Sequence, residues 1–110
     1  MAFDPILADR IRHQLARRKN FTERKMFGGI CFLLNGNMCC GVLGGDLIIR
    51  LKPDQTESLL REEHTRVFDF SGKPSRNMMY VGSKALQKDT DLKRWLQITL
   101  RFVKSLPHKP

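Results

Sequence analysis

The side chains best suited to chemistry in this sequence are three cysteines and three histidines: Cys31, Cys39, Cys40, His13, His64 and His108. Seven residues separate the first two cysteines, the last two are adjacent, and the histidines are scattered. A structural zinc site usually shows paired ligands about two to four residues apart. A catalytic cysteine needs a neighbouring base or a helix N-terminus to become a thiolate. The pattern therefore predicts no metal, no cofactor and no catalytic residue.

Two alternatives stay open for the cysteines. If Asn35-Gly36 is a two-residue turn, Cys31 falls opposite Cys40, and a bridge between them is geometrically conceivable. A reducing compartment favours free thiols that pack as small hydrophobic side chains. A small enzyme remains a third functional hypothesis, in which His64 approaches a cysteine only through the fold.

The pair Gly28-Gly29 opens an apolar segment, which is typical of a β-bulge or of a close approach to the backbone. A phosphate-binding glycine loop needs a following helix, whose N-terminal N–H groups hold the anion. Neither Gly28-Gly29 nor Gly44-Gly45 is followed by one. We therefore expect a bulge at the first pair and a turn at the second.

The net charge of +9 favours a polyanionic partner, which is either nucleic acid or an acidic protein surface. A basic face is predicted near the N-terminus, where seven Lys and Arg residues stand against three acidic ones. Its members are Arg10, Arg12, Arg17, Arg18, Lys19, Arg24 and Lys25. Such a cluster predicts salt-dependent and largely sequence-blind phosphate binding. The alternative is a solvated surface that keeps a small protein soluble.

The first half of the chain predicts a helix followed by three strands. Asp4 caps the helix, Pro5 occupies its first position, and apolar residues recur at four-residue spacing. Asn35-Gly36 is a strong hairpin signal, because a type I′ turn needs positive φ at both positions. The expected strands are 25–34, 38–43 and 47–51, and they form an antiparallel meander.

The second half predicts a short helix, two strands and a longer helix. Asp54 takes the cap position of the short helix, which reaches about residue 63. The strands are expected at 65–70 and 76–81, and Asp89-Thr90-Asp91 caps the last helix. Its inward face is Leu92, Trp95, Leu96, Thr99 and Val103. The order is α-βββ-α-ββ-α, a single α+β domain with helices packed on an antiparallel sheet.

Several segments together resemble the TfoX/Sxy N-terminal domain family. They are Lys25-Met26-Phe27-Gly28-Gly29, the Asn35-Gly36 turn with Met38, Leu47-Ile48-Ile49-Arg50-Leu51, Phe68-Asp69-Phe70, Met78-Met79-Tyr80-Val81 and Trp95-Leu96. The resemblance implies the same element order and a bacterial cytoplasmic protein. It also implies kinship with regulators of natural competence, which act with the cyclic-AMP receptor protein at promoters. Those regulators carry a second, C-terminal domain, whereas here residues 1–106 are the expected domain and 107–110 a short basic tail.

The sequence thus predicts a non-enzymatic regulatory or interaction domain. Its expected partner is a protein, with the transcription machinery implied by the resemblance. The alternative is a nucleic-acid-binding module that uses the basic face. A twofold homodimer is a further open partner, and the methionines fit either an interface or a core. No signal peptide is expected, because residues 1–5 show no apolar run of sufficient length and Asp9 and Arg10 follow soon after. No membrane span is expected, because glycines and Asp46 interrupt the apolar region 26–51. The expected location is the cytoplasm.

Overall fold

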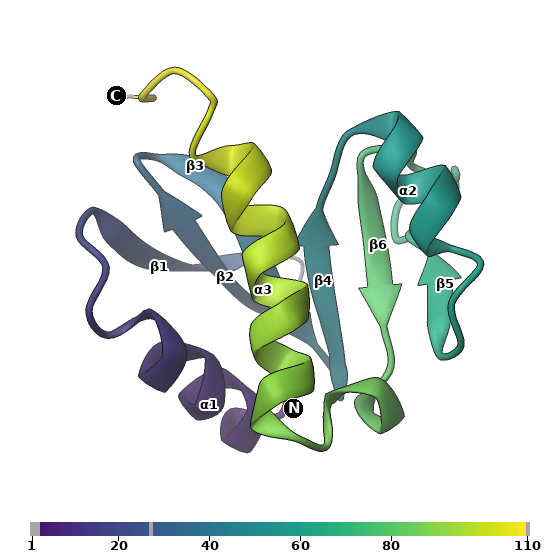
Figure 1. The fold of residues 1–110 in the computed structure, drawn as a ribbon, viewed down its shortest axis with the longest axis horizontal. Coiled ribbons are helices and arrows are strands. Elements are labelled where there is room, and N and C mark those ends of the chain that lie inside the picture. The colour runs from purple at the N-terminus through teal and green to yellow at the C-terminus, as the bar shows by residue number, and fades with distance from the viewer. Residues whose placement is uncertain (1–2, 27, 110) are drawn as a thin grey trace.

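The computed structural model describes residues 3–26 and 28–109. The described residues form three α-helices, a short 3₁₀-helix and one sheet, which confirms the predicted α+β domain and its order of helices and sheet segments. Helices α1 and α3 lie together on one face of the sheet (Figure 1). The elements are α1 Pro5–Leu15, β1 Phe21–Met26, β2 Gly29–Leu34, β3 Asn37–Leu43, β4 Asp46–Arg50, α2 Pro53–Leu59, β5 Thr65–Val67, β6 Met78–Val81, η1 Ser83–Leu86 and α3 Asp89–Val103.

Helix α1 begins as the sequence predicts. The Asp4 carboxylate accepts the N–H of Ile6 at 2.9 Å and that of Leu7 at 3.4 Å. Pro5 follows as the first helical residue, where its missing N–H costs no hydrogen bond. The N-terminal cap prediction is confirmed.

The caps of the other two helices differ from their predictions. Lys52, and not Asp54, takes the cap position of α2, because the Gln55 side chain reaches back to accept the Lys52 N–H at 3.1 Å. Lys88 occupies the cap position of α3, which makes Asp89 its first helical residue. Its carboxylate still lies in the first turn, where the helix dipole favours negative charge. The predicted inward face of α3 is confirmed, because all five side chains are buried.

The sheet has six antiparallel strands in the order β1-β2-β3-β4-β6-β5. The expected strand 25–34 is in fact two strands. β1 pairs with β2 and ends with Met26 opposite Gly29, so the chain reverses between them. The first meander therefore has four strands instead of three. The sequence did not predict β1 as a separate strand, because four of its six residues are exposed and show no alternation of apolar and polar side chains.

The two glycines of the family motif have different tasks. Gly28 lies at the reversal between β1 and β2 and has φ +75°. Residues with a side chain rarely adopt this backbone conformation. A Cβ on Gly29 would lie 2.2 Å from the Val42 carbonyl oxygen of β3. The expected bulge is therefore a hairpin turn, whereas the expected close approach of backbone is confirmed at Gly29. Phe27, between Met26 and the glycines, lies outside the described residues.

The β2–β3 hairpin corrects the predicted cysteine pairing. Asn35 and Gly36 both have positive φ, so the predicted turn is confirmed. Leu33 pairs with Met38 but Phe32 pairs with Cys40, which makes Cys39 an extra residue in β3. This β-bulge shifts the register by one residue and places Gly41 opposite Cys31. Cys31 and Cys40 therefore do not face each other across the hairpin.

The main core lies between the sheet and the helices, and it includes Trp95, Leu96 and Val103 of α3. Thr99 enters this core fully buried. Its hydroxyl lies 2.8 Å from the carbonyl oxygen of Cys39 and 2.7 Å from that of Arg50, so it binds α3 to both β3 and β4. A smaller cluster around Ile48 covers part of the opposite face of the sheet, which no α-helix covers among the described residues.

Candidate functional site

The predicted basic face is divided by the fold. Arg10 donates to Asp89 at 3.1 Å and to the Leu86 carbonyl oxygen at 2.7 Å, which ties α1 to the start of α3. Arg12 is bound by both Asp9 and Glu23, and the hydrogen bond to Glu23 raises the pKa of its guanidinium. Both arginines form ion pairs with carboxylates of the protein itself. They therefore connect elements of the fold and are less available to an external anion.

The other five predicted residues lie in two places. Arg17, Arg18 and Lys19 are exposed in the turn between α1 and β1. Arg24 and Lys25 are exposed on β1, where successive side chains point to opposite faces of the sheet. Lys25 shares the helix-covered face with Glu23, and Arg24 points to the other face. The structure therefore brings only the turn residues together as one basic cluster.

That cluster is extended by residues that the prediction omitted. Arg18 lines a groove of about 250 Å³ together with Arg101 and Lys104 from the last turns of α3, and Gln97 completes its polar rim. Cations are favoured there because the carbonyl end of a helix carries partial negative charge. The sequence indicates that Arg101 and Lys104 are solvent-facing, because they lie off the apolar face of the last helix. Only the fold shows that they lie next to Arg18 of the α1–β1 turn.

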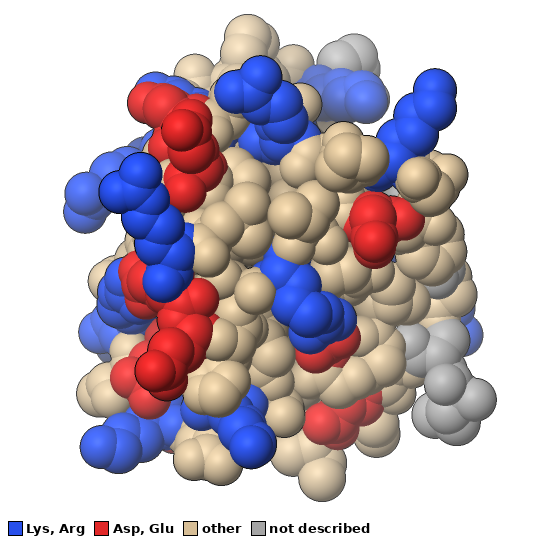
Figure 2. Space-filling view, turned by 90° about the vertical axis from the view of Figure 1, so that its right-hand side faces the viewer, with Lys and Arg blue, Asp and Glu red and all other residues tan. Residues whose placement is uncertain are grey.

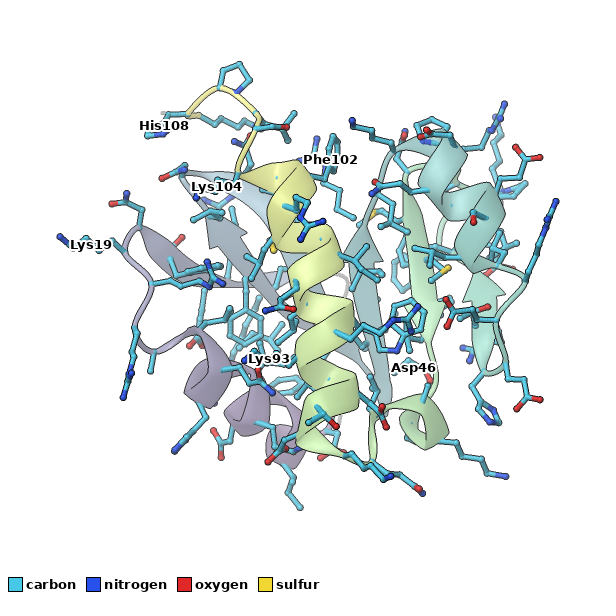
Figure 3. The ribbon with its side chains drawn as sticks, viewed as in Figure 1. Lys19, Asp46, Lys93, Phe102, Lys104 and His108 are labelled. Carbon is cyan, nitrogen blue, oxygen red and sulfur yellow. The ribbon has the colours of Figure 1, made fainter. Side chains whose placement is uncertain are left out.

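We call the surrounding region the acid-poor end. It comprises the turns 16–20 and 35–36, the α3 segment 97–104 and the tail 105–109, which together contain no Asp or Glu. The segments meet in space, because the Asn35 N–H bonds the Asn20 carbonyl oxygen at 3.0 Å and the Lys109 N–H bonds that of Asn35 at 2.8 Å. Figure 3 shows Lys19 and Lys104 at this end of the molecule and Asp46 away from it.

The opposite side of the molecule, around α2 and β5, carries paired charges. Arg66 donates to Asp46 at 2.8 Å, and Arg94 donates to Glu62 at 2.9 Å. These hydrogen bonds raise the pKa of both guanidinium groups. Figure 2 shows acidic and basic side chains interleaved on this face. We call it the paired side.

An apolar groove also lies on the paired side. It has a volume of about 360 Å³, and its walls come from α2, from β5 and from the loop before β6. Val67 of the edge strand β5 lines it and is 40% exposed. Phe70, which is 47% exposed, follows in the same loop and stacks on Phe68 at 6.3 Å between ring centroids. The apolar lining residues are Pro53, Leu60, Val67 and Pro74.

The cysteines are free and lie inside the fold, with exposed fractions of 2% or less. Burial raises the pKa of the Cys31 thiol. The pKa of Cys40 is raised well above its usual value by a hydrogen bond with Cys39 and by burial. His64 lies just before the edge strand β5, which is separated from β3 by two strands of the sheet. The neutral thiol is therefore favoured at Cys31 and Cys40, and all three cysteine side chains pack as small hydrophobic groups.

No group of three or more His, Cys, Asp or Glu side chains within residues 3–26 and 28–109 is placed to hold a metal ion. Over that same part of the chain, the helices are too short or too polar to cross a membrane.

Fold and surface together define a small α+β domain whose distinctive features are a cationic end and an apolar edge. The family model of the TfoX N-terminal domain matches residues 13–103. The chain therefore belongs to the TfoX N-terminal domain family, which confirms the resemblance seen in the sequence. Neither the curated proteins nor the solved structures contained a match.

Proposed function

We propose that this chain is a non-enzymatic interaction domain of a regulatory system and that it binds a protein partner. The observation that carries the proposal is the apolar edge at β5, where Val67 is 40% exposed beside the groove under α2. Apolar side chains exposed at a sheet edge are typical of sites where another chain packs. Membership of the TfoX N-terminal domain family supports the regulatory setting, since the resemblance to competence regulators suggests a partner in the transcription machinery.

The groove suits an apolar side chain of the partner. Its walls offer two prolines, Leu60 and Val67, and two charged lining residues, Glu57 and Arg76, that can meet polar groups of a partner. Such a combination of apolar floor and polar rim is usual at protein interfaces. The same edge is also the surface that would be shared in a twofold homodimer.

The buried thiols support the non-enzymatic part of the proposal. A cysteine nucleophile must reach the thiolate form and contact its substrate. Burial raises the pKa of Cys31, and the hydrogen bond with Cys39 raises that of Cys40, so the neutral form is favoured at both.

The test is a substitution on the groove with a matched control. Val67→Glu places a charge in the apolar wall, and we expect the tagged variant to lose most of a partner that the wild-type protein retains from source cells and that mass spectrometry identifies. Ile6→Glu adds the same charge at another exposed apolar residue, on α1, and should retain the partner. Equal retention by both variants would contradict the proposal, and sedimentation of the purified proteins reports any dimer lost with Val67.

A second candidate function is direct nucleic-acid binding through the acid-poor end. The groove lined by Arg18, Arg101 and Lys104 favours it, because no carboxylate is among its lining residues. Phosphate contacts by such residues release counterions, so affinity falls steeply with salt. This candidate differs from the predicted basic face, because Arg10 and Arg12 are already paired.

The salt dependence of duplex DNA binding tests this candidate. Changing Arg18, Arg101 and Lys104 to Gln should reduce the slope of log affinity against log salt by about 2.7, at about 0.9 per phosphate contact. The matched control changes three exposed cations elsewhere to Gln, namely Arg61, Lys73 and Lys84. An equal loss in both triple variants would indicate unspecific attraction by net charge. Undetectable binding of the wild-type protein at low salt would exclude the candidate.

A further inference from the structure

A cavity of about 330 Å³ lies near the acid-poor end, on the face of the sheet opposite α1 and α3. It is separate from the groove beside α3. Strands β1, β2, β3 and β4 form its base, and the tail after α3 forms one wall. The volume falls within the range of small-molecule sites, about 300–1,000 Å³. The lining residues are Thr22, Arg24, Met26, Leu33, Gly36, Asn37, Met38, Arg50 and Lys109.

The charged lining of this cavity is entirely cationic. Arg24, Arg50 and Lys109 come from β1, β4 and the tail, and the lining contains no Asp or Glu. None of the three forms an ion pair with a carboxylate in residues 3–26 and 28–109. Three like charges around one cavity repel each other, so an anion that enters lowers the electrostatic energy of the protein itself.

The fold fixes the Arg50 side chain and the backbone of the tail that carries Lys109. The Arg50 guanidinium donates one bond, to the Met38 carbonyl oxygen at 3.3 Å, which leaves its other N–H groups available. The tail is fixed on the β2–β3 turn, since the Asn37 side chain donates to the Pro107 carbonyl oxygen at 2.8 Å. A Cβ on Gly36 would lie 2.1 Å from the Lys109 carbonyl oxygen, so glycine permits this close contact.

Apolar side chains complete the cavity. Leu33 is buried, and Met26 and Met38 are half-buried, so all three present apolar surface between the cations. Methionine adapts to ligands of varied shape. The lining therefore combines a charge complement for an anion with a surface for an attached apolar or aromatic group.

We propose that this cavity binds an organic phosphate of nucleotide size. Arginine guanidinium groups match the paired oxygens of a phosphate, and a third cation complements its second negative charge. The attached base lies on Leu33 and the methionines. The shared chemistry is a nucleoside phosphate, whether a free mononucleotide or one unit of a single strand. The site goes beyond the protein-binding function proposed above and does not depend on it.

The experiment is a calorimetric titration of the full chain at low salt, with adenosine monophosphate, adenosine and inorganic phosphate as probes. We expect the nucleotide to bind more tightly than phosphate, and adenosine to show no binding. A short oligothymidylate distinguishes the sources, because a strand site binds it at least tenfold more tightly than the mononucleotide. Amide chemical shifts of residues 22–26, 36–38 and 109 should move on binding. Binding without shifts in these segments would overturn the proposal.

Substitutions give the second readout. Arg24→Gln with Lys109→Gln changes two exposed side chains, and we expect at least a tenfold loss of nucleotide affinity. Arg61→Gln is the matched control, because this exposed cation lies outside the cavity lining, and it should change affinity less than twofold. Equal losses in both variants, or equally tight binding of a polyglutamate peptide to the same residues, would overturn the phosphate assignment.

Discussion

The acid-poor end and the paired side use similar side chains in opposite ways. On the paired side, Arg66 and Arg94 bind carboxylates from other elements and lie over aromatic rings, at 4.7 Å from Tyr80 and 4.6 Å from Trp95. At the acid-poor end, Arg18 and Arg101 line a groove without any carboxylate. The same residue type therefore connects elements on one side and remains available to a ligand on the other.

The two regions also differ in what supports them. The strands that lead into the acid-poor end, β2 and β3, are almost completely buried, and at their other end Gly29 lies close to the Val42 carbonyl oxygen. The paired side ends in β5, which has three residues, none of them buried. A charged site needs its groups held in place, whereas an apolar edge can adapt to its partner. The difference fits the two proposals, an anion site at the acid-poor end and a protein-binding site at the edge strand β5.

The largest effect should follow from a substitution in the buried strand pair β2 and β3. Gly29→Ala places a Cβ 2.2 Å from the Val42 carbonyl oxygen, and overpacking of this kind costs up to about 3 kcal/mol. We expect a loss of that size in the free energy of unfolding measured with urea. Gly45→Ala is the control, because nothing lies within 4 Å of the added Cβ. Similar losses at both glycines would show that the two hairpins are equally tolerant.

A somewhat smaller effect is expected from the connection between α3 and the strands. Thr99→Val removes the hydroxyl between the carbonyl oxygens of Cys39 and Arg50, and a buried acceptor left without a donor costs about 2 kcal/mol. The same substitution at Thr90, which is exposed on α3, should cost far less. If Thr99→Val is neutral in urea unfolding, the bulge at Cys39 does not need this hydrogen bond.

The buried thiols Cys31 and Cys40 give a pH-dependent prediction for the same two strands. The raised pKa of Cys31 and of Cys40 means that the unfolded chain loses these protons first, so stability is full below the usual thiol pKa of about 8.5 and falls as pH rises above it. The slope for each such thiol approaches about 1.4 kcal/mol per pH unit. Urea unfolding at pH 7.5 and 9.5 measures the change, and Cys31→Ala should reduce it. A pH-independent stability in this range would contradict the burial argument.

The smallest effect concerns the charges themselves. Removing a paired cation by Arg66→Gln should cost about 0.2–1 kcal/mol, the usual value of an exposed ion pair. Removing an unpaired one by Arg101→Gln should leave the free energy of unfolding unchanged or raise it slightly, because repulsion is relieved. Urea unfolding at low salt measures both. Equal destabilisation would remove the distinction between the two regions.

Local patterns predicted most of the fold. The Asp4 cap, the Asn35-Gly36 turn and the buried face of α3 follow from rules that act over a few residues. The strand β1 was missed because an exposed edge has no apolar periodicity, and the register of β3 was missed because the bulge at Cys39 leaves no sequence signal. Both errors concern contacts between strands, which depend on residues far apart in the chain.

The candidate sites could be predicted less well for the same reason. Basic residues near in sequence were grouped together, but Arg12 is neutralised by Glu23 across the α1–β1 turn. Arg50 and Lys109 were not grouped with Arg24, because they lie 26 and 85 positions further along the chain and only the sheet and the tail bring them to one cavity. The net charge predicts an anionic partner, but only the fold shows which basic residues lie together at one site.

The attachment of the tail to the β2–β3 turn has a practical consequence for handling this protein. Figure 1 shows the two chain ends at opposite ends of the molecule. An affinity tag or fluorophore joined after the tail starts beside Lys109, at the wall of the proposed anion cavity. One joined before Asp4, whose N–H bonds the Gly44 carbonyl oxygen at 2.8 Å, starts at the far turn between β3 and β4. Labels for binding studies therefore belong at the N-terminus.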